Sequence, residues 1–479
     1  MSSATTEDVK VTPDETSLSR GVGEVWLGHL LVFAIPLTAT LFVWSGPHPW
    51  YIAPLFLIPL AVFQWWDTRD WMEKSEPEEE LPDWPFDLLV YMLAALHFFM
   101  LVGLVHLFVQ QSAFSLDMVM VVAVVGGSSG FSIITAHELI HRKEAFPQTL
   151  GRIMLSSVLY EHFYTEHLRG HHVRVGTDLD AATARYGETF REFWKRTVPG
   201  QFRSAWSLEC ARLGDEEMGI LDPRQSKNRI VHGLLLGWGV AFGILAFFGW
   251  PAFLAYVLQA FIAVRLLEAV NYFEHWGLQR SGRRVKPTDS WDTHSWFTYY
   301  GLVGLSRHAD HHTVPSRPYQ ALRVCDEAPV LPVGYLALVD MVLARNDEFI
   351  KIAKSVLRDR KLGPFASEEG EGLALLEDQR VIKAPLLQRL LTKLPVVLRK
   401  TLVPVLVLLA ISFGAWMEAD GAYSFQWTLL RNGLIAGIFV GLFIAQRRFH
   451  EWVQNAWLSW GCAIALLCVI GTSLKGVIG

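Results

Sequence analysis

The chain has 479 residues, of which 51% are hydrophobic, and a formal net charge of −5. Its mean hydropathy is +0.27 and it holds 19 Trp and 29 Phe, a composition that suits long apolar helices in lipid better than a soluble core. The modest charge, without a block of basic residues interleaved with aromatic ones, argues against nucleic acid as a partner. Four cysteines without a CxxC pair argue against a disulfide framework, an iron–sulfur cluster or a fused iron–sulfur electron carrier. The composition therefore predicts an all-α, polytopic membrane protein.

Apolar runs of about 20 residues, the length that crosses a bilayer, predict six core spans. They cover 25–44, 50–66, 86–109, 116–135, 230–248 and 253–271. A polar segment, 1–24, precedes them and lacks the apolar stretch and cleavage site of a secretory signal. The turns on one side are nearly free of Lys and Arg, whereas the other side holds residues such as Lys74, Arg142 and Lys143. By the positive-inside rule the basic side is cytoplasmic.

The last third of the chain differs from the rest. Apolar runs return at 402–417, 433–445 and 456–472 with alternating flanking charges, which predicts about three further spans. Interfacial or core helices are the alternative for the first two, because both runs are short. The sequence thus divides into a cytoplasmic segment (1–24), a membrane domain with a histidine-rich cap (25–344), a cytoplasmic linker (345–400) and a hydrophobic extension (401–479).

Nine histidines lie in four short clusters within the membrane domain. The clusters are HELIH at 137–141, EHLRGHH at 166–172, NYFEH at 271–275 and RHADHH at 307–312. Nine imidazoles are too many for one metal ion and about right for two. Each cluster falls on the cytoplasmic side, in a loop or on the last turns of a span. We therefore predict a dinuclear metal centre just below the membrane.

The spacing within the clusters suits converging ligands. On an α-helix, His137 and His141 differ by about 40° and point the same way. His167 and His171 share a face in the same manner, while His172 lies about 140° from His167, where it could bridge toward a second ion. Asn271 lies one helical turn before the histidine of its cluster. All four clusters can thus meet at one point.

Other kinds of site compete with this interpretation. HELIH also matches HExxH, the zinc-protease signature in which two histidines bind Zn²⁺ and the glutamate acts as base. Such a site needs one further ligand and would leave six of the nine histidines without a role. A closed structural zinc site would have four ligands, usually including Cys. A metal transporter is a better rival, because polar residues in spans mark ion paths, yet these histidines lie at the ends of spans rather than at the midplane.

Acidic residues beside the histidines can accept the free N–H of a ligating imidazole and fix its tautomer. The candidates for this role are Glu138, Glu166, Glu274 and Asp310; salt bridging is the alternative for each. Glu268, deep in the sixth predicted span, is expected to pair with Arg265 and brace the site, because buried charges in a span are costly. His162 and His294 are further candidates, while His29 and His97 are expected to be ordinary core residues.

The four motifs together resemble a known family. In order they read HELIHR, EHLRGHH, NYFEHWGL and SRHADHH, and the chain from 25 to 344 resembles the membrane alkane monooxygenase family, within the integral-membrane di-iron hydroxylases and desaturases. The resemblance implies an iron-binding helical bundle. The iron ligands it implies are His137, His141, His167, His171, His172, His275, His308, His311 and His312.

The resemblance also implies a reaction and its partners. A pair of iron ions would activate O₂ and hydroxylate the terminal methyl of an alkane or similar apolar chain, which would reach the site between the spans. Electrons would come from NADH or NADPH through a separate reductase and a carrier such as rubredoxin or ferredoxin. The expected location is the bacterial inner membrane, with the active site on the cytoplasmic side. The alternative is a related di-iron oxidase acting on fatty acyl or methylarene substrates.

Overall fold

The computed structural model describes residues 21–49, 52–69, 71–76, 80–113, 115–280 and 282–378. In this part of the chain all regular elements are helices, and the two isolated β-bridges belong to no strand. The predicted all-α fold is confirmed. The predicted spans of the C-terminal extension lie outside the described residues.

Five helical stretches are long and apolar enough to cross a membrane. They are Val22–Ser45, Asp83–Gln110 (α4), Leu116–His141, Arg229–Phe248 (α11) and Trp250–His275 (α12). The first consists of α1 (Val22–His29), η1 (Leu30–Phe33) and α2 (Ala34–Ser45), and the third of α5 (Leu116–Ala123) and α6 (Val125–His141). Side-chain caps begin two of them, since Ser115 accepts a hydrogen bond from Met118 N and Asn228 one from Ile230 N.

The segment predicted as the second span differs from that prediction. After a short turn, η2 (Ala53–Phe56), it forms only α3 (Leu57–Asp67), which is shorter than the roughly 20 residues a crossing needs. The carboxylate of Asp67, at the end of α3, accepts hydrogen bonds from the hydroxyls of Ser295 (2.6 Å) and Thr298 (2.8 Å). The apolar residues of this run therefore belong to a helix anchored to the cap of the bundle, and the count of six spans is not confirmed.

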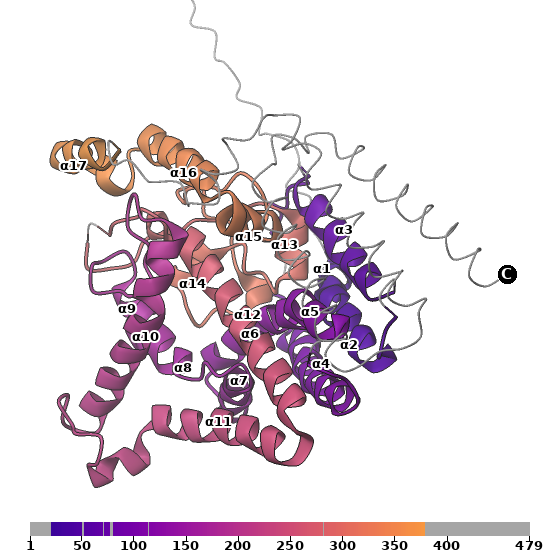
Figure 1. Ribbon diagram of the computed structural model, residues 1–479. Coiled ribbons are helices and arrows are strands. Elements are labelled where there is room, and N and C mark those ends of the chain that lie inside the picture. The colour runs from indigo at the N-terminus through magenta and orange to yellow at the C-terminus, as the bar shows by residue number, and fades with distance from the viewer. Residues whose placement is uncertain are drawn as a thin grey trace, which may run out of the picture.

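The other described helical elements form this cap. They are α7 (Ala145–Ser157), α8 (Phe163–Thr165), the π-helix η3 (Glu166–His171), α9 (His172–Arg174), α10 (Phe190–Arg212), η4 (Pro223–Lys227), η5 (Pro287–Asp289), α13 (Trp296–Gly301), α14 (His308–Thr313), η6 (Tyr319–Ala321), α15 (Tyr335–Ala344), α16 (Asn346–Arg360), η7 (Gly363–Ala366) and α17 (Glu368–Asp378). In Figure 1, α16 and α17 lie at the top and α11 at the bottom, with α15, α6 and α12 between them.

Helices α6 and α12 pack closely along their length. A Cβ atom added at Gly126 would lie 2.7 Å from Ile262 Cβ, and one at Gly130 would lie 2.9 Å from Leu266 Cδ1. Small residues at such a contact let two membrane helices approach. Because α6 ends at His141 and α12 at His275, this packing brings the ends of the first and third histidine clusters together.

This contact gives a test of the packing. Gly126→Ala should lower the thermal unfolding midpoint, because its methyl group would overlap Ile262. Gly127→Ala is the matched control, since a Cβ there meets nothing within 4 Å. The two variants should differ by about 1–3 kcal/mol in stability, the usual cost of overpacking, as measured by thermal unfolding in detergent. Equal midpoints would contradict the close α6–α12 contact.

Candidate metal centre

The structure gathers all nine predicted histidines into two groups. The five-histidine group consists of His137, His141, His167, His172 and His311, and the four-histidine group of His171, His275, His308 and His312. Within each group the potential ligand atoms lie within 4.8 Å of one another. The two groups adjoin, since the rings of His172 and His312 stack with centroids 4.3 Å apart. Each cluster expected from the sequence therefore contributes to this centre.

The distances between imidazole nitrogens fit a shared ion. Nε2 of His167 lies 3.0 Å from Nε2 of His141 and 2.9 Å from Nε2 of His172. In the four-histidine group, the Nε2 atoms of His275 and His308 are 3.1 Å apart. Two nitrogens bound at right angles to an ion, each at about 2.1 Å, would be about 3.0 Å apart. The side chains are thus arranged as a ligand set.

The second cluster divides between the groups in a way that α-helical spacing did not predict. His167 and His172 belong to the five-histidine group, and His171 belongs to the four-histidine group. The reason is that EHLRGH forms a π-helix, in which residues five apart, rather than four apart, are hydrogen-bonded neighbours. The prediction that His172 would reach toward the second ion was wrong, because that role falls to His171.

Burial favours the neutral form of five of these imidazoles. For His167, His172, His308, His311 and His312, burial in the cap, reinforced by neighbouring imidazoles, holds the pKa well below its usual value of 6.5. A neutral imidazole offers a nitrogen lone pair, which is the form that binds metals. The site can therefore bind metal ions without first losing protons at neutral pH.

Asp180, which orients His171, was not among the residues predicted from the sequence. Its Oδ2 atom is 2.8 Å from His171 Nδ1 and also accepts a hydrogen bond from the Thr183 hydroxyl (2.6 Å). This contact directs His171 Nε2 toward the four-histidine group and fixes its tautomer. The place of Asp180 nine residues after His171 was a possible signal, but this residue is not adjacent to any of the histidine clusters in the sequence.

Glu274, one of the predicted acidic residues, lies beside the four-histidine group. One of its oxygens, Oε2, is 3.3 Å from His308 Nε2, while Oε1 accepts a hydrogen bond of 2.8 Å from the Tyr335 hydroxyl. Because His308 Nε2 also faces His275 Nε2, the carboxylate stands on the side where the ligand atoms converge. Glu274 can thus offer an oxygen to this smaller group, with Tyr335 holding it in place.

Two other acidic residues form ion pairs, as the alternative interpretation held. Glu138 lies 3.0 Å from the guanidinium of Arg142 and accepts a hydrogen bond from Tyr319 N (3.3 Å). Asp310 lies 2.6 Å from Arg317. These pairs stabilise the ends of α6 and α14 beside the histidines.

The remaining predicted residues lie around the site. Burial raises the pKa of Glu166 to about 7. Glu268 accepts hydrogen bonds from the Tyr160 hydroxyl (2.9 Å) and from Asn271 Nδ2 (3.2 Å). The predicted partner of Glu268, Arg265, instead stacks on Phe190 and Trp194, 5.0 and 5.2 Å from the ring centroids.

The two further histidine candidates belong to neither histidine group. His162 packs against Tyr160 and Phe202, and the backbone oxygen of His294 accepts a hydrogen bond from Glu73 N.

A bundle of apolar helices capped by two adjoining histidine groups defines a histidine-rich integral membrane metalloprotein. Comparison with known proteins gives its family. The fatty acid desaturase family model matches residues 113–338. An alkane 1-monooxygenase of Pseudomonas aeruginosa is 30% identical over 74% of this chain and 95% of its own length. The chain therefore belongs to the alkane 1-monooxygenase family.

Two further relatives show how far the likeness extends. Another alkane 1-monooxygenase of Pseudomonas aeruginosa is 40% identical over 44% of this chain, and the match spans only 56% of that relative. The xylene/toluene monooxygenase hydroxylase component of Pseudomonas putida is 25% identical over 47% of this chain and 60% of its own length. The likeness thus reaches proteins named for different hydrocarbons.

The orienting contact at His171 can be tested directly. Asp180→Ala should weaken metal binding about 10- to 100-fold, the usual effect of losing a carboxylate behind a ligating histidine. Asp180→Asn should recover part of this loss, because its amide oxygen can still accept the imidazole N–H. Asp178→Ala is the control, since Asp178 lies on the same loop but is exposed. Metal titration of the apoprotein gives the affinities, and equal affinities for the two Ala variants would refute the role of Asp180.

Proposed function

We propose that this protein is a membrane di-iron monooxygenase that hydroxylates the terminal methyl of alkanes or similar apolar chains. The observation that carries the proposal is the pair of adjoining, buried histidine groups beside an apolar helical bundle. Nitrogen ligands suit iron, and a coordination sphere that is not filled by protein leaves room for oxygen. When bound, a pair of iron ions would supply the redox chemistry that activates O₂.

The competing functions fit the geometry less well. In a zinc protease the glutamate of HELIH must reach a metal-bound water, but Glu138 is ion-paired with Arg142. His137 and His141 also share their group with three further histidines, where a protease needs one further ligand. A transporter requires ligands that release the ion along a path, whereas these histidines are held by buried partners such as Asp180.

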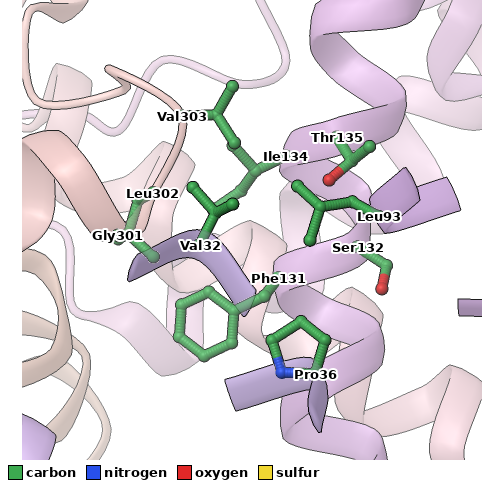
Figure 2. Close-up of a pocket in the computed structure, with 10 residues that line it drawn as sticks. All are labelled: Val32, Pro36, Leu93, Phe131, Ser132, Ile134, Thr135, Gly301, Leu302 and Val303. Carbon is green, nitrogen blue, oxygen red and sulfur yellow. The ribbon is translucent and has the colours of Figure 1, made fainter. Parts of the chain in front are cut away.

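An apolar cavity lies beside the proposed reaction site (Figure 2). Its volume is only about 10 Å³, so an alkyl group enters if the side chains of the lining move apart. The lining includes Val32, Leu93, Phe131, Ile134 and Val303. The side chains from α6 precede His137 by about one turn, and the segment 301–303 leads to the fourth histidine cluster. An apolar wall excludes water and accepts an alkyl chain. We propose that the reacting end of the substrate occupies this cavity.

Two other substrate classes, methylarenes and fatty acyl chains, are compatible with the same cavity. The relative named as a xylene/toluene monooxygenase component favours methylarenes as the alternative, and the desaturase family match favours fatty acyl chains. The lining is almost wholly apolar, with only the hydroxyls of Ser132 and Thr135 among its side chains. The cavity would therefore exclude a charged group at the reacting end of a substrate, but it would discriminate little between one hydrocarbon and another.

Electrons must be supplied from outside the chain in this proposal. The sequence has no cysteine pair for an iron–sulfur centre, so NADH or NADPH would act through a separate reductase and a carrier such as rubredoxin or ferredoxin. Arg142, on the side predicted to be cytoplasmic, forms ion pairs with Glu138 and Asp87. A polar pocket lined by Arg174, Arg185 and Asp180 adjoins His171 through Asp180 and is a better docking place. The proposed orientation puts this face in the cytoplasm of a bacterial inner membrane.

The function can be tested with purified, iron-replete protein in lipid. We expect about two iron ions per chain, because nine imidazoles exceed the needs of one. With O₂, NADH, a reductase and rubredoxin or ferredoxin, an alkane should yield the primary alcohol, detected by mass spectrometry. Omission of the carrier should stop turnover. One zinc ion and no iron would refute the proposal.

The proposed ligands can be tested by substitution. His308→Ala should abolish activity. His97→Ala should retain it, because the His97 imidazole bonds the Ser157 hydroxyl and is not a proposed ligand.

The cavity gives a separate prediction about chain length. Leu93→Phe should fill part of the cavity, so that turnover of long alkanes falls relative to short ones while the iron content stays unchanged. Leu88→Phe is the control, because Leu88 lies on the same helix with 46% of its surface exposed, whereas Leu93 is 5% exposed. Product ratios from mixed alkanes give the selectivity. An unchanged ratio in Leu93→Phe would show that the substrate binds elsewhere.

A further inference from the structure

Five aromatic side chains, here termed the aromatic file, run from the surface toward the metal centre. The centroid distances are 5.5 Å from Trp71 to Trp66, 5.5 Å from Trp66 to Trp296, 5.1 Å from Trp296 to Tyr300 and 4.8 Å from Tyr300 to Tyr299. Indole and phenol are the aromatic side chains that give up one electron most readily. Neighbouring rings in contact permit such an electron to move by short steps.

The inner end of the file reaches the residue that precedes a predicted ligand. The guanidinium of Arg307 lies 4.1 Å from the Tyr299 ring centroid, and His308 follows Arg307 directly. The Arg307 side chain also donates a hydrogen bond of 2.6 Å to the backbone oxygen of Leu322, which holds it in place. Tyr299 is therefore in contact with the segment that carries His308 into the four-histidine group.

The outer end of the file is open to the surroundings. Trp71 is 58% exposed, whereas Tyr300 and Tyr299 are 1% and 3% exposed. The backbone N–H of Trp296 donates a hydrogen bond of 2.8 Å to the oxygen of Trp71, which ties the outer and middle parts together. Gly28 makes room for the inner part, since a Cβ there would lie 2.5 Å from the Tyr300 ring. The file thus leads without interruption from exposed to buried rings.

Simpler roles explain only part of this arrangement. Tryptophans gather at membrane–water interfaces, which accounts for the exposed ring of Trp71 but not for the buried tyrosines. Packing alone would be satisfied by phenylalanine, and phenylalanine is present next to the file, because Phe297 lies 5.9 Å from Trp66. Every position of the file itself holds Trp or Tyr.

We propose that the aromatic file carries electrons from the surface to the metal centre when O₂ is activated without a substrate. This inference rests on the proposed monooxygenase function. Reduction of O₂ to two waters takes four electrons; during hydroxylation the carrier supplies two and the substrate supplies two. Without a substrate, the file supplies the missing two, one at a time. Each transfer leaves an oxidised indole at Trp71, which a thiol or a similar one-electron reductant in the medium restores.

Electrons and protons balance when a thiol is the reductant that restores Trp71. Two thiols give one disulfide, two electrons and two protons. With two more electrons from the carrier and two more protons from water, one O₂ becomes two waters. The file would thus protect the histidine groups from oxidation during turnover without substrate.

The test measures which side chains become oxidised. Iron-loaded full-length protein in lipid is given O₂, NADH, the reductase and the carrier, with catalase present and with neither alkane nor thiol. Peptide mass spectrometry should show oxygen adducts on Trp71 and Trp66 above the level on Trp84, which is 72% exposed but lies outside the file. Rapid-freeze electron paramagnetic resonance should show an aromatic radical, and added thiol should remove both signals.

A substitution that interrupts the aromatic file should change which residues are oxidised. In Trp296→Phe, the adducts on Trp71 and Trp66 should fall to the level of Trp84, and fewer turnovers should precede inactivation. Trp84→Phe is the control and should leave the adducts on Trp71 and Trp66 unchanged. If Trp296→Phe does not fold, as judged by iron content, Trp66→Phe interrupts the same file and should remove the adducts on Trp71.

Two outcomes would overturn the inference. One is equal oxidation of Trp71 and Trp84 in the unaltered protein, which would indicate a diffusing oxidant. The other is unchanged oxidation of Trp71 in the interrupted variants. A protein that binds no iron or consumes no O₂ would refute the proposed function instead, whereas O₂ consumption without adducts along the file would refute this inference alone.

Discussion

The fold depends on burying nine imidazoles at one point. Buried polar groups are costly unless they find partners, and the Nε2 atoms of His171 and His312, both in the four-histidine group, have no hydrogen-bond partner in the structure. Metal ions bound between the two groups would satisfy the nitrogens that face inward. The surrounding elements serve to hold the rings in position: two closely packed helices, α6 and α12, end at His141 and His275, and Asp180 fixes the tautomer of His171.

The π-helix resolves a geometric problem in this arrangement. Three histidines within six residues reach two separate groups, and an α-helical turn would have placed His167 with His171 and set His172 apart. The wider turn of η3 sets His167 and His172 on one side and His171 on the other, as the membership of the two groups shows. π-Helical turns are frequent at functional sites, and here the reason is that one segment provides ligands to both groups.

The site also separates apolar from polar approaches. The apolar cavity lies among Val32, Leu93 and Ile134, which belong to the spans, whereas the polar pocket beside Asp180 is lined by residues between Arg174 and Glu216, in the cap. The aromatic file forms a third connection, through Trp296 and Tyr300. In the proposed function, substrate and electrons therefore reach the same centre along different paths, so that a hydrocarbon and a soluble protein need not compete for one entrance.

The sequence by itself determined the all-α class, the histidines that gather and five long apolar helices, because hydrophobic runs and ligand motifs are local properties of the chain. It did not determine the division of the histidines, since a prediction from α-helical spacing cannot foresee a π-helix at 166–171. Nor did it identify Asp180 or Tyr335 as partners of the site, or show that the apolar run at 50–66 ends in a short helix tied to Ser295. These features arise from contacts between segments far apart in the sequence or from departures from ideal helical geometry, and only the packed tertiary structure decides them.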